Sequence, residues 1–147
     1  MGVRENILAN LKSTLEGITT GNGYNTTVNA VYDNPLSLSE VDTTNLPIID
    51  ISIGAEDYTP LLGGNVFNLN CDFLFRIYVR DDGSNNIRSQ INNLLEDIDK
   101  AIIQDGTRGS TAIDTTIGAK DPPRIWSGKG QVAIADVIIS VLYRRDL

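Results

Sequence analysis

The fold of this chain is decided by the stretch Phe67-Asn68-Leu69-Asn70-Cys71-Asp72-Phe73-Leu74-Phe75-Arg76-Ile77-Tyr78-Val79. Every second residue from Phe67 onward is apolar, which is the pattern of a β-strand with one buried and one open face. At roughly 3.3 Å per residue, the strand to Arg80 is about 46 Å long, whereas a compact globule of this chain length is only about 38 Å across. We therefore expect the strand to extend beyond its own subunit and to need a neighbour for its exposed ladder groups.

A helix is expected before this strand and another after it. Apolar residues recur at helical spacing over 7–18 and again over 87–102. Either Gly17 or the cluster Gly21-Asn22-Gly23 is expected to end the first helix. Ser84 is the expected N-cap of the second, and Gly106 its stop.

Further strands complete the expected fold. Apolar runs indicate strands at 26–32, 48–53, 112–117 and 131–144. In the first of them Val28, Ala30 and Tyr32 are expected to share one face, and in the second Ile49, Ile51 and Ile53 are expected to face inward. Residues 54–65 are expected to form a hairpin connection or a flexible excursion. The result is a single α+β domain over 1–147 with the order α-β-β-β-α-β-β. Its sheet is mainly antiparallel or mixed, with both helices on one face and long protruding strands.

The strand expected at 131–144 is apolar on both of its faces, broken only by Asp136, Ser140 and Arg144 on one of them. Such a strand is buried on both sides. Two helices cover only one side of a sheet this long, so we expect a partner to cover the rest.

Composition excludes several classes of function. The 147 residues carry a net charge of −7 and no histidine, and therefore lack the commonest general base and metal ligand. The excess of acidic residues lies entirely before Arg76, which argues against tight nucleic-acid binding. No apolar run is long enough for a membrane span. Cys71 is the only cysteine and is expected to be a core residue, consistent with synthesis in the cytoplasm.

Three polar segments contain residue types used in chemistry, but none has the spacing of a known site. Residues 81–86 lack the ligand pattern of a calcium loop and are expected to form a strand-to-helix turn. Glu96, Asp97 and Asp99 are expected on a solvated helix face. Residues 127–130 contain a Gly-Lys pair but precede a strand, so they are expected to form a turn rather than a phosphate-binding loop. We predict no catalytic, cofactor-binding or metal-binding residue.

Four residues are candidates for contact with another subunit or partner. Arg76, Tyr78 and Arg80 alternate on the expected open face of the long strand, and Trp126 is the only tryptophan. Their alternative role is an ordinary solvated face for the first three and local core for Trp126. From this placement, Arg76→Glu is expected to give a folded monomer that fails to assemble.

The chain resembles the tail terminator proteins of long-tailed bacteriophages, the family of the lambda minor tail protein U. The resemblance covers nearly the whole chain. It depends on the N-terminal helix running into Thr20-Gly21-Asn22-Gly23-Tyr24, the strand from Pro47 to Gly54, the strand from Phe73 to Val79, the second amphipathic helix and the strand from Gln131 to Arg145.

This resemblance implies a structural virion protein rather than an enzyme. Such proteins form a ring, usually a hexamer, at the head-tail junction, where the ring caps the tail tube, ends its polymerisation and offers the surface that joins the head. The implied partners are copies of the chain itself, the tail tube protein and a head-completion or connector protein. DNA would only pass through the lumen, where like charge disfavours adhesion.

Three alternatives remain open at this stage. The chain could be another neck component, such as a head-completion or connector protein, which would bind the portal or an adaptor instead of the tube. It could be a small metal-dependent hydrolase using Asp81, Asp82 or Asp99, although ligand spacing and a paired nucleophile are missing. It could also be a small-ligand binding module, for which nothing in the sequence marks a pocket.

Overall fold

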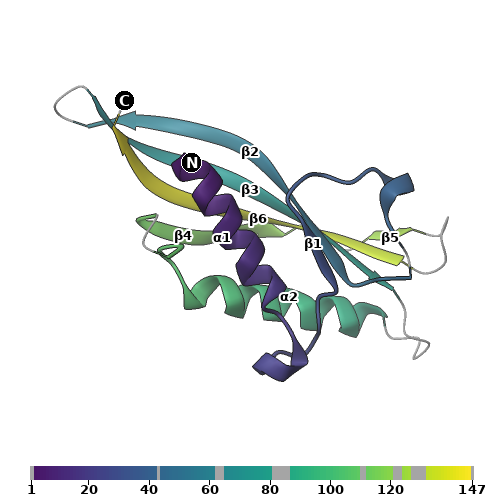
Figure 1. Cartoon of the computed structure of the whole chain (residues 1–147). Coiled ribbons are helices and arrows are strands. Elements are labelled where there is room, and N and C mark those ends of the chain that lie inside the picture. Colours follow the sequence, from purple (N-terminus) through teal and green to yellow (C-terminus); the bar gives the residue numbers. More distant parts are fainter. Residues whose placement is uncertain are drawn as a thin grey trace.

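A computed structural model of the chain describes residues 2–42, 44–61, 65–80, 87–109, 112–120, 124–126 and 132–146. It contains two α-helices, α1 (Val3–Glu16) and α2 (Ile87–Gln104), and two short 3₁₀ helices, η1 (Thr20–Asn22) and η2 (Leu38–Glu40). The strands are β1 (Ala30–Tyr32), β2 (Ile48–Pro60), β3 (Val66–Arg80), β4 (Asp114–Lys120), β5 (Arg124–Trp126) and β6 (Val132–Asp146) (Figure 1). The predicted α+β class and the order of the main elements are confirmed.

The strands form one mixed sheet in the order β1-β2-β3-β6-β4, and β5 pairs with the far end of β6. Only β1 and β2 are parallel; all other pairs are antiparallel. The centre of the sheet is the pair β3 and β6, which are matched over their full lengths, from Val66 opposite Asp146 to Arg80 opposite Val132. Residues 67–79, whose alternating pattern predicted a long strand, therefore lie in the central strand.

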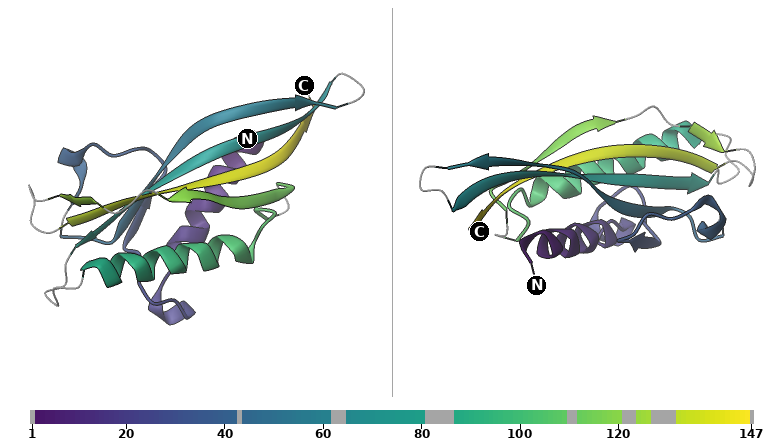
Figure 2. Two further views of the ribbon diagram at one scale, coloured as in Figure 1. Left: turned by 180° about the vertical axis from the view of Figure 1, so that it is seen from behind. Right: turned by 90° about the horizontal axis from the view of Figure 1, so that it is seen from above.

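Both helices pack on one face of this sheet, as predicted. Apolar residues of α1, including Ile7, Leu11 and Leu15, share a single core with Ile91, Leu94, Ile98 and Ile102 of α2 and with every second residue of β3 from Leu69 to Val79. Gly17 ends α1, and its backbone N–H bonds to the carbonyls of Ser13 and Thr14. Cys71 is completely buried in this core, as expected. Figure 2 shows the long curved strands with the helices crossing them.

Strand β2 is longer than predicted. Residues 54–60 were expected in a connection, but they continue the strand after an irregularity between Ile53 and Glu56, where Gly54 and Ala55 bulge out of register. The residues around this bulge lack period-two alternation, so the sequence pattern hid the second half of the strand. As a result, β2 follows β3 almost to its beginning, with Pro60 opposite Phe67.

Three further expectations about strands need correction. In β1 the inward residue is Val31, whereas Tyr32 is exposed and Ala30 packs on the opposite face. The expected common face is wrong, because the chain is not yet a strand at Val28, which lies in the main core while Ala30 packs on the opposite face. Ile53 of β2, which was expected to face inward, is 43% exposed. In addition, residues 124–126 form the short strand β5, for which no strand was predicted.

The central strands protrude beyond the helices, as predicted. At the end of the sheet that carries Pro60, Val66 and Asp146, strands β2, β3 and β6 extend past α1 and α2 (Figures 1 and 2). The outermost paired segments at this end are residues 57–60, 66–68 and 144–146. We call these three segments the arm. At its edge, the rings of Tyr58 and Phe67 meet edge-to-face with their centroids 6.2 Å apart.

Candidate assembly surface

The second face of the sheet, opposite the helices, is covered at one end by the chain itself. Leu36, Val41 and Leu46, from the segment between β1 and β2, pack against Ile48, Tyr78, Val132 and Ile134. These residues bury that end of β6 on its second face. The expectation that another molecule must cover all of this face is therefore wrong for this end.

A buried carboxylate ties the covering segment to the sheet. Asp50 of β2 is only 2% exposed and accepts hydrogen bonds from the Tyr78 hydroxyl at 2.9 Å and from the backbone N–H of Leu36 at 3.2 Å. Burial raises the pKa of Asp50, and the two hydrogen bonds oppose that rise. The pKa of Tyr78 is also raised, first by burial and then by its bond to Asp50. Asp50 therefore helps to fix the polypeptide that covers the second face.

Arginines from two strands meet on a second carboxylate beside this one. Asp136 of β6, 6% exposed, accepts from Arg76 Nε at 3.1 Å and from Arg124 Nη1 at 3.3 Å. The bond to Asp136 is the main reason that the pKa of Arg76 is raised. Replacing Arg76 by glutamate would place a third acid beside Asp50 and Asp136, which destabilises the fold. Arg76→Glu is thus not the selective test of assembly that the sequence suggested.

Of the four predicted contact residues, the three with described side chains have different surroundings. Tyr78 is completely buried, so the prediction that it lies on an open face is wrong, because the segment after β1 covers it. Arg76 is part of the ion pair with Asp136, and Arg80 is exposed at the end of β3. Trp126 lies in β5 opposite Val132, and its side chain is outside the described part of the structure.

The acidic residues of α2 also differ from expectation. Asp97 is buried rather than solvated and accepts a hydrogen bond from the backbone N–H of Asn25 at 3.0 Å. Asp99 pairs with Lys120 of β4 at 2.7 Å. Lys100 lies over the ring of Tyr24, with its Nζ 5.1 Å from the centroid. These groups join α2 to its neighbours. The turns expected at 81–86 and 127–130 lie outside the described residues.

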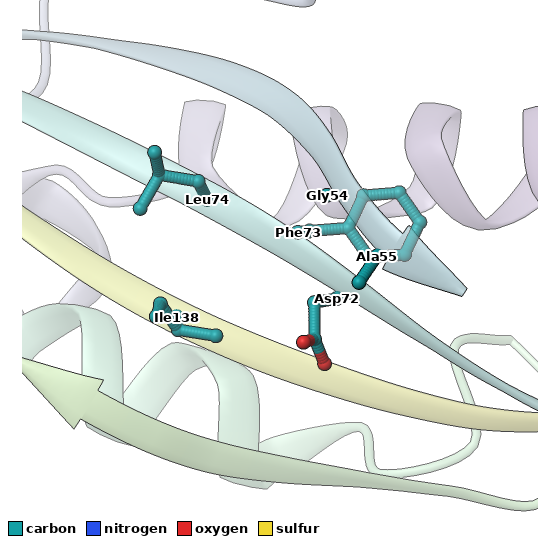
Figure 3. A pocket seen from close by; sticks show the side chains of 6 residues that line it. All are labelled: Gly54, Ala55, Asp72, Phe73, Leu74 and Ile138. Atoms are coloured by element: carbon teal, nitrogen blue, oxygen red, sulfur yellow. The ribbon is translucent and has the colours of Figure 1, made fainter. Parts of the chain in front are cut away.

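The middle of the second face remains open and contains a shallow hollow of about 230 Å³. Figure 3 shows its lining, which is Gly54, Ala55, Asp72, Phe73, Leu74 and Ile138. The Asp72 carboxylate accepts a hydrogen bond from Ser140 at 2.6 Å, while Leu74 and Ile138 sit opposite one another on β3 and β6. A hollow with one engaged carboxylate and otherwise apolar side chains is suited to contact rather than to chemistry.

The exposed large apolar side chains lie along the two opposite borders of the sheet. Tyr32, Ile53 and Tyr58 follow β1 and β2, and Tyr58 is 54% exposed. Ile103 and Ile113 lie at the end of α2 and just before β4, and Ile103 is 70% exposed. We call the first group the β2 border and the second the β4 border. Neither border was predicted, because Tyr58 lies in the expected connection and Ile103 lies next to the apolar stripe of α2.

Each of these borders also has a strand with one unpaired edge. Strand β1 pairs with only three of the 13 residues of β2, from Ile48 to Asp50. Among the described residues, β4 is the last strand on the other side of the sheet. Unpaired ladder groups of this kind are templates for pairing with another chain.

Within the described part of the chain, no group of three or more His, Cys, Asp or Glu side chains is placed to hold a metal ion. The described helices include none that is both long and apolar enough to cross a membrane. The chain matches no protein-family model and no curated protein.

Proposed function

We propose that this chain is a structural virion protein of a long-tailed bacteriophage. Copies of it form a ring that caps the tail tube, ends tube polymerisation and provides the surface that joins tail to head. The proposal combines the resemblance of the sequence to tail terminators with the two borders and the arm described above.

The observation that carries the proposal is the incompleteness of the sheet within one subunit. Two of its strands have free edges on opposite sides, and three strands extend past the helices as the arm. A free, partly apolar strand edge is an aggregation hazard in a protein that works alone. In an assembly protein, such an edge is available to pair with a neighbouring subunit. Head-to-tail contacts that close by rotation produce rings.

The charge distribution supports the same role. The net charge of −7 belongs entirely to the part of the chain before Arg76, which contains α1 and β2. A ring that turns this part toward its lumen would let DNA pass without holding it, since like charges repel.

The direct test uses the tail tube protein of the same virus. The purified chain is first examined by light scattering and negative-stain electron microscopy, where rings with a central hole are expected. It is then added to polymerising tube protein, where we expect shorter tubes, each closed at one end by a ring.

Two outcomes would contradict the proposal. If the chain leaves tube length unchanged and instead binds the portal or an adaptor, it is a neck component of another kind. If it turns over a substrate only with an added metal ion, the structural role is wrong.

A further inference from the structure

We propose that the free edge of β2 pairs, antiparallel, with β4 of a second copy of this chain, so that one sheet continues from subunit to subunit. The occupant of each border is thus the opposite border of an identical neighbour. The inference rests on the proposed ring and names the contact that builds it.

Strand directions favour this pairing. From β2 through β3 and β6 to β4, every neighbour is antiparallel, so β4 runs opposite to β2. When an identical subunit is placed beside the first in the same orientation, its β4 meets the free edge of β2 running in the opposite direction. The antiparallel alternation of the sheet then continues across the contact without a break. Antiparallel pairing is also slightly the more stable kind.

The distribution of apolar side chains points to a head-to-tail contact rather than a two-fold dimer. A two-fold interface uses the same patch on both subunits, whereas a head-to-tail contact uses two different patches. Here the exposed large apolar residues fall into two sets on opposite borders, Tyr32, Ile53 and Tyr58 on one and Ile103 and Ile113 on the other.

Both edge strands carry the same irregularity. In β2 the register breaks between Ile53 and Glu56, around Gly54-Ala55, and in β4 it breaks between Ile117 and Lys120, around Gly118-Ala119. A bulge on one edge normally discourages pairing. If Glu56 lies opposite Ile117 of the neighbour, however, Ile53 lies opposite Lys120, and the two bulges coincide. Two edges whose bulges coincide can pair with each other, whereas a regular strand would match neither of them.

The same register gives compatible neighbours on each face. Asp57 and Thr116 both point away from the helices, since they pair with Asn70 and Ser140, and they come to lie opposite each other. Tyr58 comes opposite Thr115, with Ile113 at the diagonal position beyond it. No two like charges are placed directly opposite, and aromatic and β-branched residues at diagonal positions are close enough to pack.

Cysteine cross-linking tests this register directly. Asp57→Cys and Thr116→Cys are each exposed single substitutions, and the native Cys71 is a silent background because it is buried and burial raises its pKa to about 11. The two variants are mixed and treated with a short thiol-to-thiol cross-linker. We expect a covalent dimer in the mixture, none from either variant alone, and a ladder of oligomers from the double variant. The control mixes Asn93→Cys, on the exposed surface of α2, with Thr116→Cys and should give no dimer.

Each result separates this contact from the proposed function. Oligomers without the 57–116 cross-link overturn the contact but leave the ring possible through another surface. A cross-linked ring that does not cap tail tubes supports the contact and contradicts the tail function. A protein that remains monomeric and uncross-linked at every concentration overturns the contact, and tube capping by that monomer would then show whether the tail role survives. Dimers from the Asp57→Cys variant alone would indicate a two-fold contact and also overturn the proposal.

Discussion

At the scale of single residues, the most informative position is Asp50. Its carboxylate is buried between the covering segment and the sheet, and its Oδ2 accepts hydrogen bonds from the Tyr78 hydroxyl and the Leu36 amide. The sequence placed Asp50 in a strand and Tyr78 on an open face. It could not place the segment that contains Leu36, because a polar, turn-rich stretch has no periodicity that reveals what it covers. Because this contact was not predicted, the burial of Tyr78 was not predicted either.

Asp50 is expected to give the protein a pH dependence of defined sign. Because its pKa is raised in the folded state, the folded chain holds its proton more tightly than the unfolded chain. The free energy of unfolding should therefore fall as pH rises from the ordinary value of 3.8 through the raised pKa, and stay level above it. Asp50→Asn removes this titration, so its stability relative to the native chain should improve over that window.

Urea unfolding of both proteins at several pH values measures this difference. Glu40, Asp42 and Asp105, whose pKa values are lowered, give the opposite slope, but they are present in both proteins and cancel. Stability curves that run parallel at all pH values would show that Asp50 does not titrate differently in the folded state.

At the scale of elements, the long strands were predictable and their irregularities were not. Strands β3 and β6 and both helices follow directly from period-two and period-3.6 patterns, because those patterns report which face is buried. A bulge shifts the period by leaving residues unpaired, so the second half of β2 looked like a connection. The two borders could not be predicted for a different reason. Which strands lie at the edges of a sheet depends on the order of the strands, and no single strand's pattern reveals that order.

The bulge in β4 should be intolerant of added volume. A Cβ on Gly118 would lie 3.0 Å from the carbonyl oxygen of Ile138 and 3.5 Å from its Cγ2, so β4 would have to move away from β6. We expect Gly118→Ala to destabilise the fold by about 1–3 kcal/mol, the usual cost of overpacking. Gly21→Ala is the matched control, because only the Thr19 hydroxyl lies near its Cβ position, at 3.9 Å. Equal midpoints of urea unfolding for the two variants would mean that the bulge adapts easily.

At the scale of the whole molecule, the subunit is polarised. One border carries β1 and β2, the other carries β4 and the end of α2, and the arm extends from the end at which β2 turns into β3. A subunit with two unlike borders and a projecting arm has the asymmetry that a closed ring requires. The sequence led us to expect neighbouring subunits but did not indicate which surfaces would meet.

Tyr58 tests this polarity in solution. Its side chain is exposed on the β2 border and, within the subunit, contacts the ring of Phe67. Tyr58→Glu should weaken self-association at least about fivefold, since tyrosines that act as interface hot spots contribute more than about 1 kcal/mol. The folded monomer should lose no more than about 1.5 kcal/mol from the aromatic pair. Sedimentation over a concentration series measures the first and urea unfolding the second. Asn93→Glu is the control, and an effect equal to that of Tyr58→Glu would assign the change to charge alone.

The pairing of β3 with β6 has a consequence for how the protein is made. The partner of the central strand lies more than fifty residues further along the chain, after α2, β4 and β5. During synthesis, the backbone hydrogen-bonding groups on one side of β3 therefore have no partner strand until β6 has been translated. Pairings this distant in sequence form slowly and leave nascent chains prone to aggregation. Yield of the soluble product should thus depend on chaperones and on a low growth temperature during expression.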